Sequence, residues 1–341
     1  MIARLYVQLP FRLVLPKDAQ FDLWGYENDG LKFQIELPKV SEDLQAQVSS
    51  HSIRLNGAEG IYTDVLTINF LKDSFERSAD APCDPAEEVI EGVVKAFLER
   101  LKYVVKSSQV KIPDFKNYSW NLTYLNDDGS DLAEEPGKIM SRGGITVRYS
   151  WIWCDPFVWD GVQSLPPDFA APEWRTLLTD AHGALPHIGT AVVLACASLE
   201  VFIAHILKNL QVHAGIPGNL WSFINDRQPL HMQPTVDEQY SALLEIGCGH
   251  SLKSETDLWR KFLHLRNARN KFVHEGVAAV EGRQINVKDA ADLLRAAETI
   301  VLTIRGWLPD HLQWPLFERG EKWTVEITQN FGSVTEAETS E

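Results

Sequence analysis

The chain has 341 residues, 45% of them hydrophobic, which is enough for two domains that each bury a core. Its formal net charge of −15 at pH 7 excludes broad nucleic-acid binding over the whole surface, because neutralising phosphates requires a basic surface. The four cysteines (Cys83, Cys154, Cys196 and Cys248) are widely spaced and lack metal-ligand spacing, so we expect reduced thiols, no metal and no cofactor.

Residues 1–155 are rich in strand-like segments. These contain β-branched and aromatic residues, are separated by turn signals, and read RLYVQL, LKFQIEL, HSIRL, YTDVLTINF, YSWNLTYL and GITVRYSWIW. One amphipathic helix is predicted over 85–105, with Pro85 at its start and acidic residues in its first turn. This part is therefore predicted to be a β-rich α+β domain packed around one long helix.

Residues 156–171 are rich in proline and are predicted to connect this domain to a helical one. Beyond them, apolar residues recur at helical spacing, which predicts helices over 172–182, 187–213, 236–246, 255–274 and 287–305. The fourth of these opens with a capping-box-like start at Ser254–Asp257 and closes at Gly276, and the fifth ends at Gly306. Residues 172–310 thus form a predicted all-α bundle.

Residues 311–341 are predicted to be a C-terminal extension. It contains a strand-like KWTVEIT and ends in the acidic tail SVTEAETSE, which we expect to be disordered.

The longest apolar run, TAVVLACASLEVFIAHIL at 190–207, is interrupted by Glu200 and His205. These polar residues favour a buried or dimer-facing helix over a membrane span. The N-terminal residues lack the pattern of a secretory signal, so we expect a cytoplasmic protein without a membrane partner.

One segment of this acidic chain is locally basic. The segment from Lys253 to Val273 contains six basic residues and only two acidic ones, Glu255 and Asp257. Any site that binds a polyanion is expected there.

The predicted helix at 255–274 separates its apolar and polar residues. Its apolar stripe consists of Leu258, Phe262, Leu265 and Phe272. Arg266, Asn270 and His274 follow one another at intervals of four and share another face, with Arg269 beside them. A guanidinium can grip phosphate oxygens and an imidazole can transfer protons near neutral pH, so these groups suffice for metal-free phosphodiester cleavage. The alternative is a solvated basic face that complements the helix dipole.

The run Arg269-Asn270-Lys271-Phe272-Val273-His274 matches the R-polar-x3-H form of the motif of the HEPN superfamily, and the Glu275-Gly276 that follows resembles the Apea-like branch. The apolar run at 190–207 resembles the long first HEPN helix, in which a small-residue stretch leads to an acid on the buried face, here Glu200. The resemblance covers about residues 185–308 and leaves out the N-terminal half.

This resemblance implies a metal-independent endoribonuclease. Arg269 would orient the scissile phosphate and stabilise its developing charge, His274 would be the general acid or base, and Asn270 would fill the motif's polar position. Arg266 and Lys271 would bind substrate, with a dimer contact as the alternative for Arg266. Glu200 would orient one of these side chains or be a structural acid. The expected products carry a 2′,3′-cyclic phosphate and a 5′-hydroxyl.

HEPN domains usually pair about a two-fold axis, so a homodimer is expected. The family implies a role in bacterial antiviral defence or a toxin system, with the N-terminal domain as a sensor or regulatory domain that holds a protein trigger or inhibitor. The alternative is a noncatalytic HEPN module that binds RNA or a protein partner. The chain lacks the motifs of P-loop nucleotide hydrolases, zinc proteases and serine hydrolases.

Overall fold

The computed structural model describes residues 2–17, 19–28, 31–37, 51–55, 58–71, 85–112, 120–126, 128–130, 138–140, 151–225, 234–318 and 325–329. The chain divides into two compact units: residues 1–105, 109–170 and 317–341 form the first, and residues 106–108 and 171–316 form the second. The first unit carries a large sheet and the second consists mainly of helices. The predicted fold class, a β-rich α+β half followed by a helical half, is confirmed at this level.

The sheet of the first unit is built on two long antiparallel strands, β1 (Ile2–Pro16) and β5 (Ala58–Leu71). The shorter strands are β2 (Trp24–Asn28), β3 (Leu31–Glu36), β4 (His51–Leu55), β6 (Trp120–Leu125), β7 (Lys138–Met140), β8 (Trp151–Trp153) and β11 (Val325–Gln329). Within the described residues the sheet order is β11-β4-β5-β1-β6-β7, with the β2–β3 hairpin also attached to β5 and β8 lying parallel to β1.

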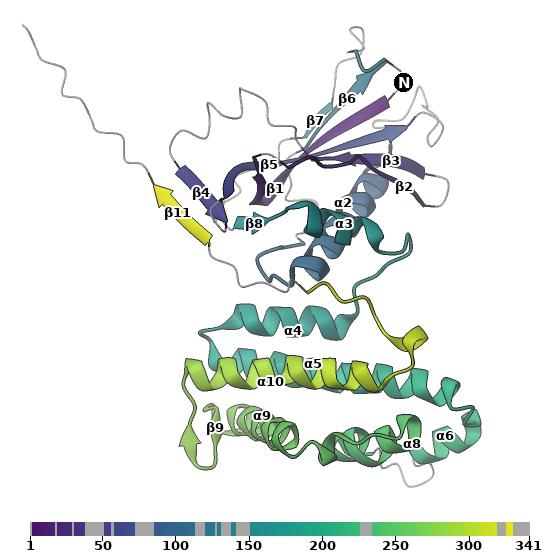
Figure 1. Cartoon of the computed structure of the whole chain (residues 1–341), viewed down its shortest axis with the longest axis vertical. Helices are drawn as coiled ribbons and strands as arrows, with labels where there is room; N and C mark the ends of the chain where they lie inside the picture. The colour runs from purple at the N-terminus through teal and green to yellow at the C-terminus, as the bar shows by residue number, and fades with distance from the viewer. Residues whose placement is uncertain are drawn as a thin grey trace, which may run out of the picture. The chain divides into compact units, whose positions relative to one another are not determined.

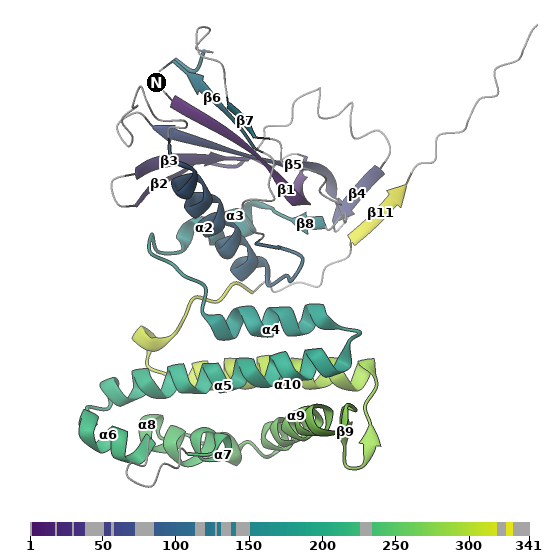
Figure 2. The same cartoon turned by 180° about the vertical axis from the view of Figure 1, so that it is seen from behind.

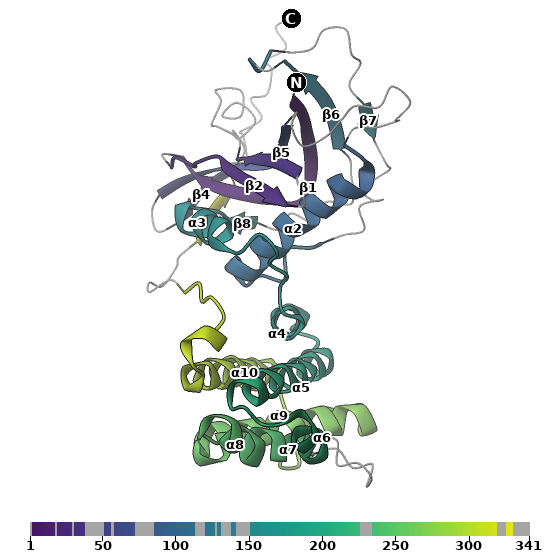
Figure 3. The same ribbon diagram turned by 90° about the vertical axis from the view of Figure 1, so that its right-hand side faces the viewer.

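Strand β1 alternates between the two faces of the sheet. Ala3, Leu5 and Val7 are buried on one face, so Arg4, between the first two, points to the other. Helices α2 (Glu87–Val105) and α3 (Pro156–Ser164) lie on the same side of the sheet (Figures 1 and 3). The ring centroids of Trp24 on β2 and Trp159 on α3 are 6.2 Å apart, which places both indoles in one core.

Helix α3 corrects the prediction of a connector at 156–171. The Asp155 side chain accepts a hydrogen bond from the Val158 backbone N–H at 3.0 Å, and Pro156 occupies the first helical turn, so the helix is capped and started in the usual way. Trp159 on this helix is only 1% exposed. The segment is thus part of the first unit's core: Pro156 starts the helix, and Pro166 and Pro167 follow its end.

Arg100 on α2 is fully buried and binds the end of α3. Its guanidinium donates to the carbonyls of Leu165 at 2.9 Å and Pro167 at 3.0 Å, and also to that of Pro166. Burial lowers the pKa of this guanidinium. These contacts hold the segment that follows α3, where the Pro166 carbonyl also accepts from the Phe169 N–H and the Pro167 carbonyl also accepts from the Tyr26 hydroxyl.

The C-terminal extension also differs from the prediction, because the chain returns to the first unit. Residues from Phe317 onward belong to that unit, and β11 pairs antiparallel with β4. Strand β11 coincides with the end of the strand-like KWTVEIT. The tail predicted to be disordered, and the first residues of GITVRYSWIW, lie outside the described residues.

The second unit is a layered helical bundle. Its main helices are α4 (Glu173–Ala184), α5 (Ile188–His213), α9 (Thr256–Glu275) and α10 (Val287–Trp307). Helices α5 and α10 lie side by side, with α4 on one side of them and α9 on the other (Figures 1 and 2). The shorter elements are α6 (Gly218–Asn225), α7 (Val236–Glu238), η3 (Gln239–Leu243), α8 (Leu244–Cys248), η4 (Leu252–Ser254), β9 (Ala279–Val280), β10 (Arg283–Gln284) and η5 (Asp310–Leu312).

The five predicted helices are confirmed within two residues at each end, the third of them as the run from α7 to α8. Helix α6 was not predicted. Helix α5 is the one described helix long and apolar enough to cross a membrane, and 56% of its most apolar window is buried within the structure. Its buried residues include Leu199, Phe202 and Ile206, as expected for the central helix of a bundle.

Candidate functional site

Helix α9 carries the predicted basic motif. The cap predicted for its start is not formed, whereas the cap predicted for its end is. Glu255 is the N-cap and makes no side-chain capping bond. The predicted capping box at Ser254–Asp257 is therefore wrong, because Ser254 closes the 3-10 turn η4. The predicted end is confirmed: Gly276 adopts a φ of 76°, and its N–H donates to the Phe272 carbonyl at 2.8 Å.

The apolar side of α9 packs against α5. The Cys196 thiol lies 3.6 Å from the Leu265 carbonyl, and the Phe272 ring lies so close to Gly189 that a Cβ there would be 2.0 Å from it. The two helices therefore run antiparallel, in contact over about two turns. The fully buried residues of α9 are Phe262, Leu265 and Ala268. This packing leaves the opposite face of α9 to solvent.

Arg269 stands at the edge of the packed face and is half-buried. Its guanidinium donates to the Asn270 side-chain oxygen at 3.0 Å. Among the described residues, no carboxylate lies within ion-pair distance of Arg269. A guanidinium placed in this way keeps donors available for an anion that approaches from solvent.

Arg266 differs from Arg269 because its charge has a partner. It forms an ion pair with Asp237 of α7, and its guanidinium lies 5.6 Å from the centre of the Phe262 ring. The structure thus ties Arg266 to another helix, whereas the sequence predicted a contact to substrate or to a second chain.

Tyr240, which the sequence analysis did not single out, fixes the same helix in place. It lies in the π-helical turn η3, is fully buried, and donates through its hydroxyl to the Leu199 carbonyl of α5 at 2.7 Å. Its ring also packs against Phe262, with centroids 4.8 Å apart. Asp237 and Tyr240 together attach the α7–α8 run to both helices that form the site.

Glu200 is exposed, which corrects its expected place on the buried face of α5. The buried positions around it are taken by Leu199 and Ile203, so the helical period turns Glu200 toward solvent. Its charge still acts locally: burial and then Glu200 raise the pKa of Cys196 to about 12, and Arg269 and Arg266 oppose this rise. The acid and both arginines therefore share the surroundings of one thiol.

His274 and Lys271 lie in the last turns of α9 and are both exposed. Lys271 forms an ion pair with Glu275 one turn on. His264, at the middle of the helix, contacts Glu281 of the β9–β10 turn at 3.2 Å. His274 is the more accessible imidazole of α9, at the end of the helix.

The geometry of a regular helix separates the two principal motif residues. Five positions apart, Arg269 and His274 point about 140° apart around the axis and are displaced by about 7.5 Å along it. The two side chains therefore leave the helix in different directions, and a phosphate bound by both would have to lie between them beyond the end of α9. Asn270 lies between them in azimuth, about 40° from His274.

Within the part of the chain that the structure describes, no group of three or more His, Cys, Asp or Glu side chains is arranged to hold a metal ion. Comparisons of the sequence with protein-family models and with curated proteins, and of the fold with solved structures, find no match.

Proposed function

We propose that the second unit is a metal-independent endoribonuclease of the HEPN type. One observation carries the proposal: the exposed end of α9 presents Arg269, without a carboxylate partner among the described residues, and the accessible imidazole of His274. The antiparallel packing of α9 on α5, and the resemblance of both helices to HEPN helices, support it. RNA is the substrate because its 2′-hydroxyl supplies the nucleophile.

The proposed reaction needs two proton transfers: one proton is removed from the 2′-hydroxyl and one is donated to the 5′-oxygen. The 2′-oxygen attacks the adjacent phosphorus while a neutral imidazole takes the hydroxyl proton, and the bond from phosphorus to the 5′-oxygen breaks. A protonated imidazole donates to the departing 5′-oxygen. Arg269 binds the non-bridging oxygens, where negative charge builds up in the transition state. The products carry a 2′,3′-cyclic phosphate and a 5′-hydroxyl.

The site is completed by a second copy of the chain. A two-fold axis beside the end of α9 brings Arg269 of one copy toward His274 of the other and supplies two imidazoles, one base and one acid. Three large apolar side chains around this end are unusually exposed: Val273 at 52%, Val277 at 42% and Val287 at 44%. Exposed apolar residues beside a polar site suit a protein interface.

Labelled total RNA incubated with the full chain in EDTA tests the proposal. The wild-type protein is expected to cleave RNA, and His274→Ala is expected to be inactive. His264→Ala is the matched control, because His264 lies on the same helix but contacts Glu281. Equal cleavage by the wild type and by His274→Ala removes the proposal.

The alternative is a noncatalytic module that binds RNA or a protein partner through the same face. The separation of Arg269 and His274 on α9 favours it, because each side chain can bind an anion without the other. This function is identified if the chain binds RNA without cutting it and if Arg269→Ala weakens that binding.

The proposed setting is the bacterial cytoplasm, in antiviral defence or a toxin system. The first unit is proposed to sense a trigger or to hold a protein inhibitor. A fragment of residues 171–316 tests this, because it lacks the first unit including β11; of the second unit it lacks only residues 106–108. If the toxicity of that fragment depends on the trigger as strongly as the toxicity of the full chain does, the first unit has no regulatory role.

A further inference from the structure

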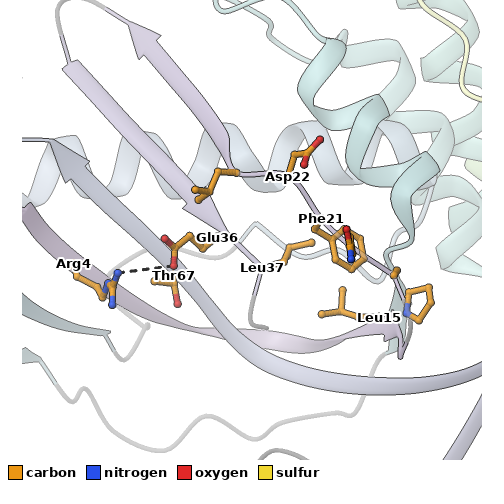
Figure 4. Close-up of a pocket in the computed structure, with 11 residues that line it drawn as sticks. Arg4, Leu15, Phe21, Asp22, Glu36, Leu37 and Thr67 are labelled. Atoms are coloured by element: carbon orange, nitrogen blue, oxygen red, sulfur yellow. Dashed lines mark ion pairs between the residues drawn. The ribbon is translucent and has the colours of Figure 1, made fainter. Parts of the chain in front are cut away.

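A cavity of about 840 Å³ lies in the first unit (Figure 4). Its walls come from strands β1, β3 and β5 and from the segment that follows β1. This volume falls in the range of sites that bind small molecules. The cavity is far larger than a single water requires.

Three polar residues of the lining lie close together at one end of the cavity, where Figure 4 shows Arg4, Glu36 and Thr67. The other polar residues of the lining are Gln20 and Asp22. Strand register explains this: Glu36 pairs with Thr67 across β3 and β5, and Arg4 pairs with Asn69 across β1 and β5. Residues 67 and 69 lie two positions apart on one strand, so all four side chains share one face of the sheet.

Asn69, which is only 3% exposed, holds the two charged side chains in place. Its side-chain oxygen accepts from Arg4 Nε at 2.8 Å, and its side-chain nitrogen donates to Glu36 Oε1 at 2.8 Å. The direct approach of Arg4 to Glu36 Oε2 is 4.0 Å, longer than a hydrogen bond. A guanidinium donor and a carboxylate acceptor therefore stand side by side with hydrogen-bonding capacity left for a ligand.

The rest of the cavity is mainly apolar. Figure 4 places Phe21 and Leu15 at the other end and Leu37 between the two ends. Phe21 packs edge-on against Trp159, with centroids 6.4 Å apart, so its ring is held by the core. A ligand that fills this space needs a flat apolar body as well as one polar edge.

The charges of the lining exclude an anionic ligand. Arg4 is balanced by Glu36, and Asp22 adds a second carboxylate to the wall. A phosphate or free carboxylate beside Arg4 would meet Glu36 and a cation that Glu36 already balances, while Asp22 lies apart from both in Figure 4. A small zwitterion would match the polar end but would leave the apolar end empty.

We propose that this cavity binds an uncharged nucleoside through its base. The edge of a nucleobase offers an adjacent acceptor and donor, which match the Arg4 guanidinium and the Glu36 carboxylate, and the Thr67 hydroxyl adds a third partner. The ring of the base lies against Phe21 and Leu37. This site belongs to the first unit and does not depend on RNA cleavage by the second.

Calorimetric titration of the full chain with adenosine, guanosine, cytidine and uridine tests the proposal. At least one nucleoside is expected to bind saturably with a Kd below about 1 mM. Glu36→Gln is expected to weaken it by about tenfold or more, and Thr67→Val by about three- to tenfold, because the first loses a charged hydrogen-bond acceptor and the second a neutral partner. The matching 5′-monophosphate is expected to bind more weakly than the nucleoside.

Thr123→Val is the matched control for Thr67→Val, because Thr123 lies opposite Arg4 on β6 but does not line the cavity. Circular dichroism verifies that each variant is folded. The proposal is overturned if none of the four nucleosides binds, if the monophosphate binds as tightly as its nucleoside, or if folded Glu36→Gln and Thr67→Val bind like the wild type. Each of these readouts is independent of nuclease activity.

Discussion

Asp237 and Arg266 form an ion pair that joins helix α7 to helix α9. The pair lies one turn along α9 from Arg269, and Tyr240, on the same helical run as Asp237, is bonded to α5. Arg266 thereby fixes the helices that position the site, while Arg269 remains the cation available to an incoming anion.

This ion pair is expected to contribute modestly to stability. The two side chains are 30% and 42% exposed, so solvent screens their attraction, and a coupling energy of about 0.5–1 kcal/mol is expected. A double-mutant cycle with Asp237→Ala and Arg266→Ala, followed by urea unfolding, measures it. The coupling should shrink in high salt. If the losses of unfolding free energy in the two single variants add up to the loss in the double variant, the contact does not hold α7 in place.

Substitution of Arg269 is expected to abolish cleavage without unfolding the chain. Arg269→Ala should lower the rate by about a hundredfold to a thousandfold, because one positioned electrostatic contact to the phosphate is lost. Arg269→Lys should fail nearly as badly, since an ammonium cannot make the paired hydrogen bonds. Arg260→Ala is the control, because Arg260 lies on α9 but pairs with Asp257. A fully active Arg269→Lys would contradict the role given to the guanidinium.

Mixing two inactive variants should restore activity if each site draws on both chains. A dimer of one Arg269→Ala chain and one His274→Ala chain retains one intact pair of motif residues. After unfolding and joint refolding, random pairing makes about half of the dimers mixed, and each mixed dimer keeps one Arg269–His274 pair but only one imidazole. The mixture should therefore be more active than either variant alone, yet remain below about a quarter of the wild-type activity. Each variant refolded alone provides the baseline. A mixture no more active than its components would place both residues in a site made by one chain.

The buried thiol of Cys196 predicts a loss of stability at alkaline pH. Its pKa is raised from 9.0 to about 12 in the folded chain, so above pH 9 the unfolded chain releases a proton that the folded chain retains. Stability is therefore complete below pH 9 and falls as the pH rises toward 12. At pH 10.5 the free energy of unfolding should be about 2 kcal/mol lower than below pH 9 because of this thiol.

Urea unfolding of the wild type and of Cys196→Ala at pH 8 and at pH 10.5 measures this cost. The variant lacks the thiol, so its free energy of unfolding should fall less between the two pH values. The hydroxyl of Tyr240 also has its pKa raised, first by burial and then by Cys196. The effect of burial is present in both proteins and cancels, whereas the effect of Cys196 on Tyr240 is lost with the thiol and adds to the difference. Equal falls in the two proteins would exclude Cys196 as the source.

Local patterns in the sequence were sufficient to locate most helices. Apolar residues at helical spacing marked α5, α9 and α10, and a glycine at position 276 marked the end of α9, because a residue there must adopt a positive φ. The start of α3 carried an equally local signal in Asp155 and Pro156, but the prolines that follow favoured a connector.

Contacts between distant segments were not readable from one sequence. The pairing of β11 with β4 joins residues more than 250 positions apart, and the Asp237–Arg266 pair joins residues 29 apart. The exposure of Glu200 depends on how α5 is rotated in the bundle, which its packing against the neighbouring helices decides.

The chemical ends left on cleaved RNA distinguish metal-free attack by the 2′-hydroxyl from metal-dependent hydrolysis. A defined RNA labelled at either end is incubated with the full chain in excess EDTA, and the products are treated with polynucleotide kinase and with phosphatase to identify their termini. We expect products with a 2′,3′-cyclic phosphate and a 5′-hydroxyl from the wild type, and no such products from His274→Ala. Cleavage that requires added magnesium, or that leaves 5′-phosphate ends, would contradict this mechanism.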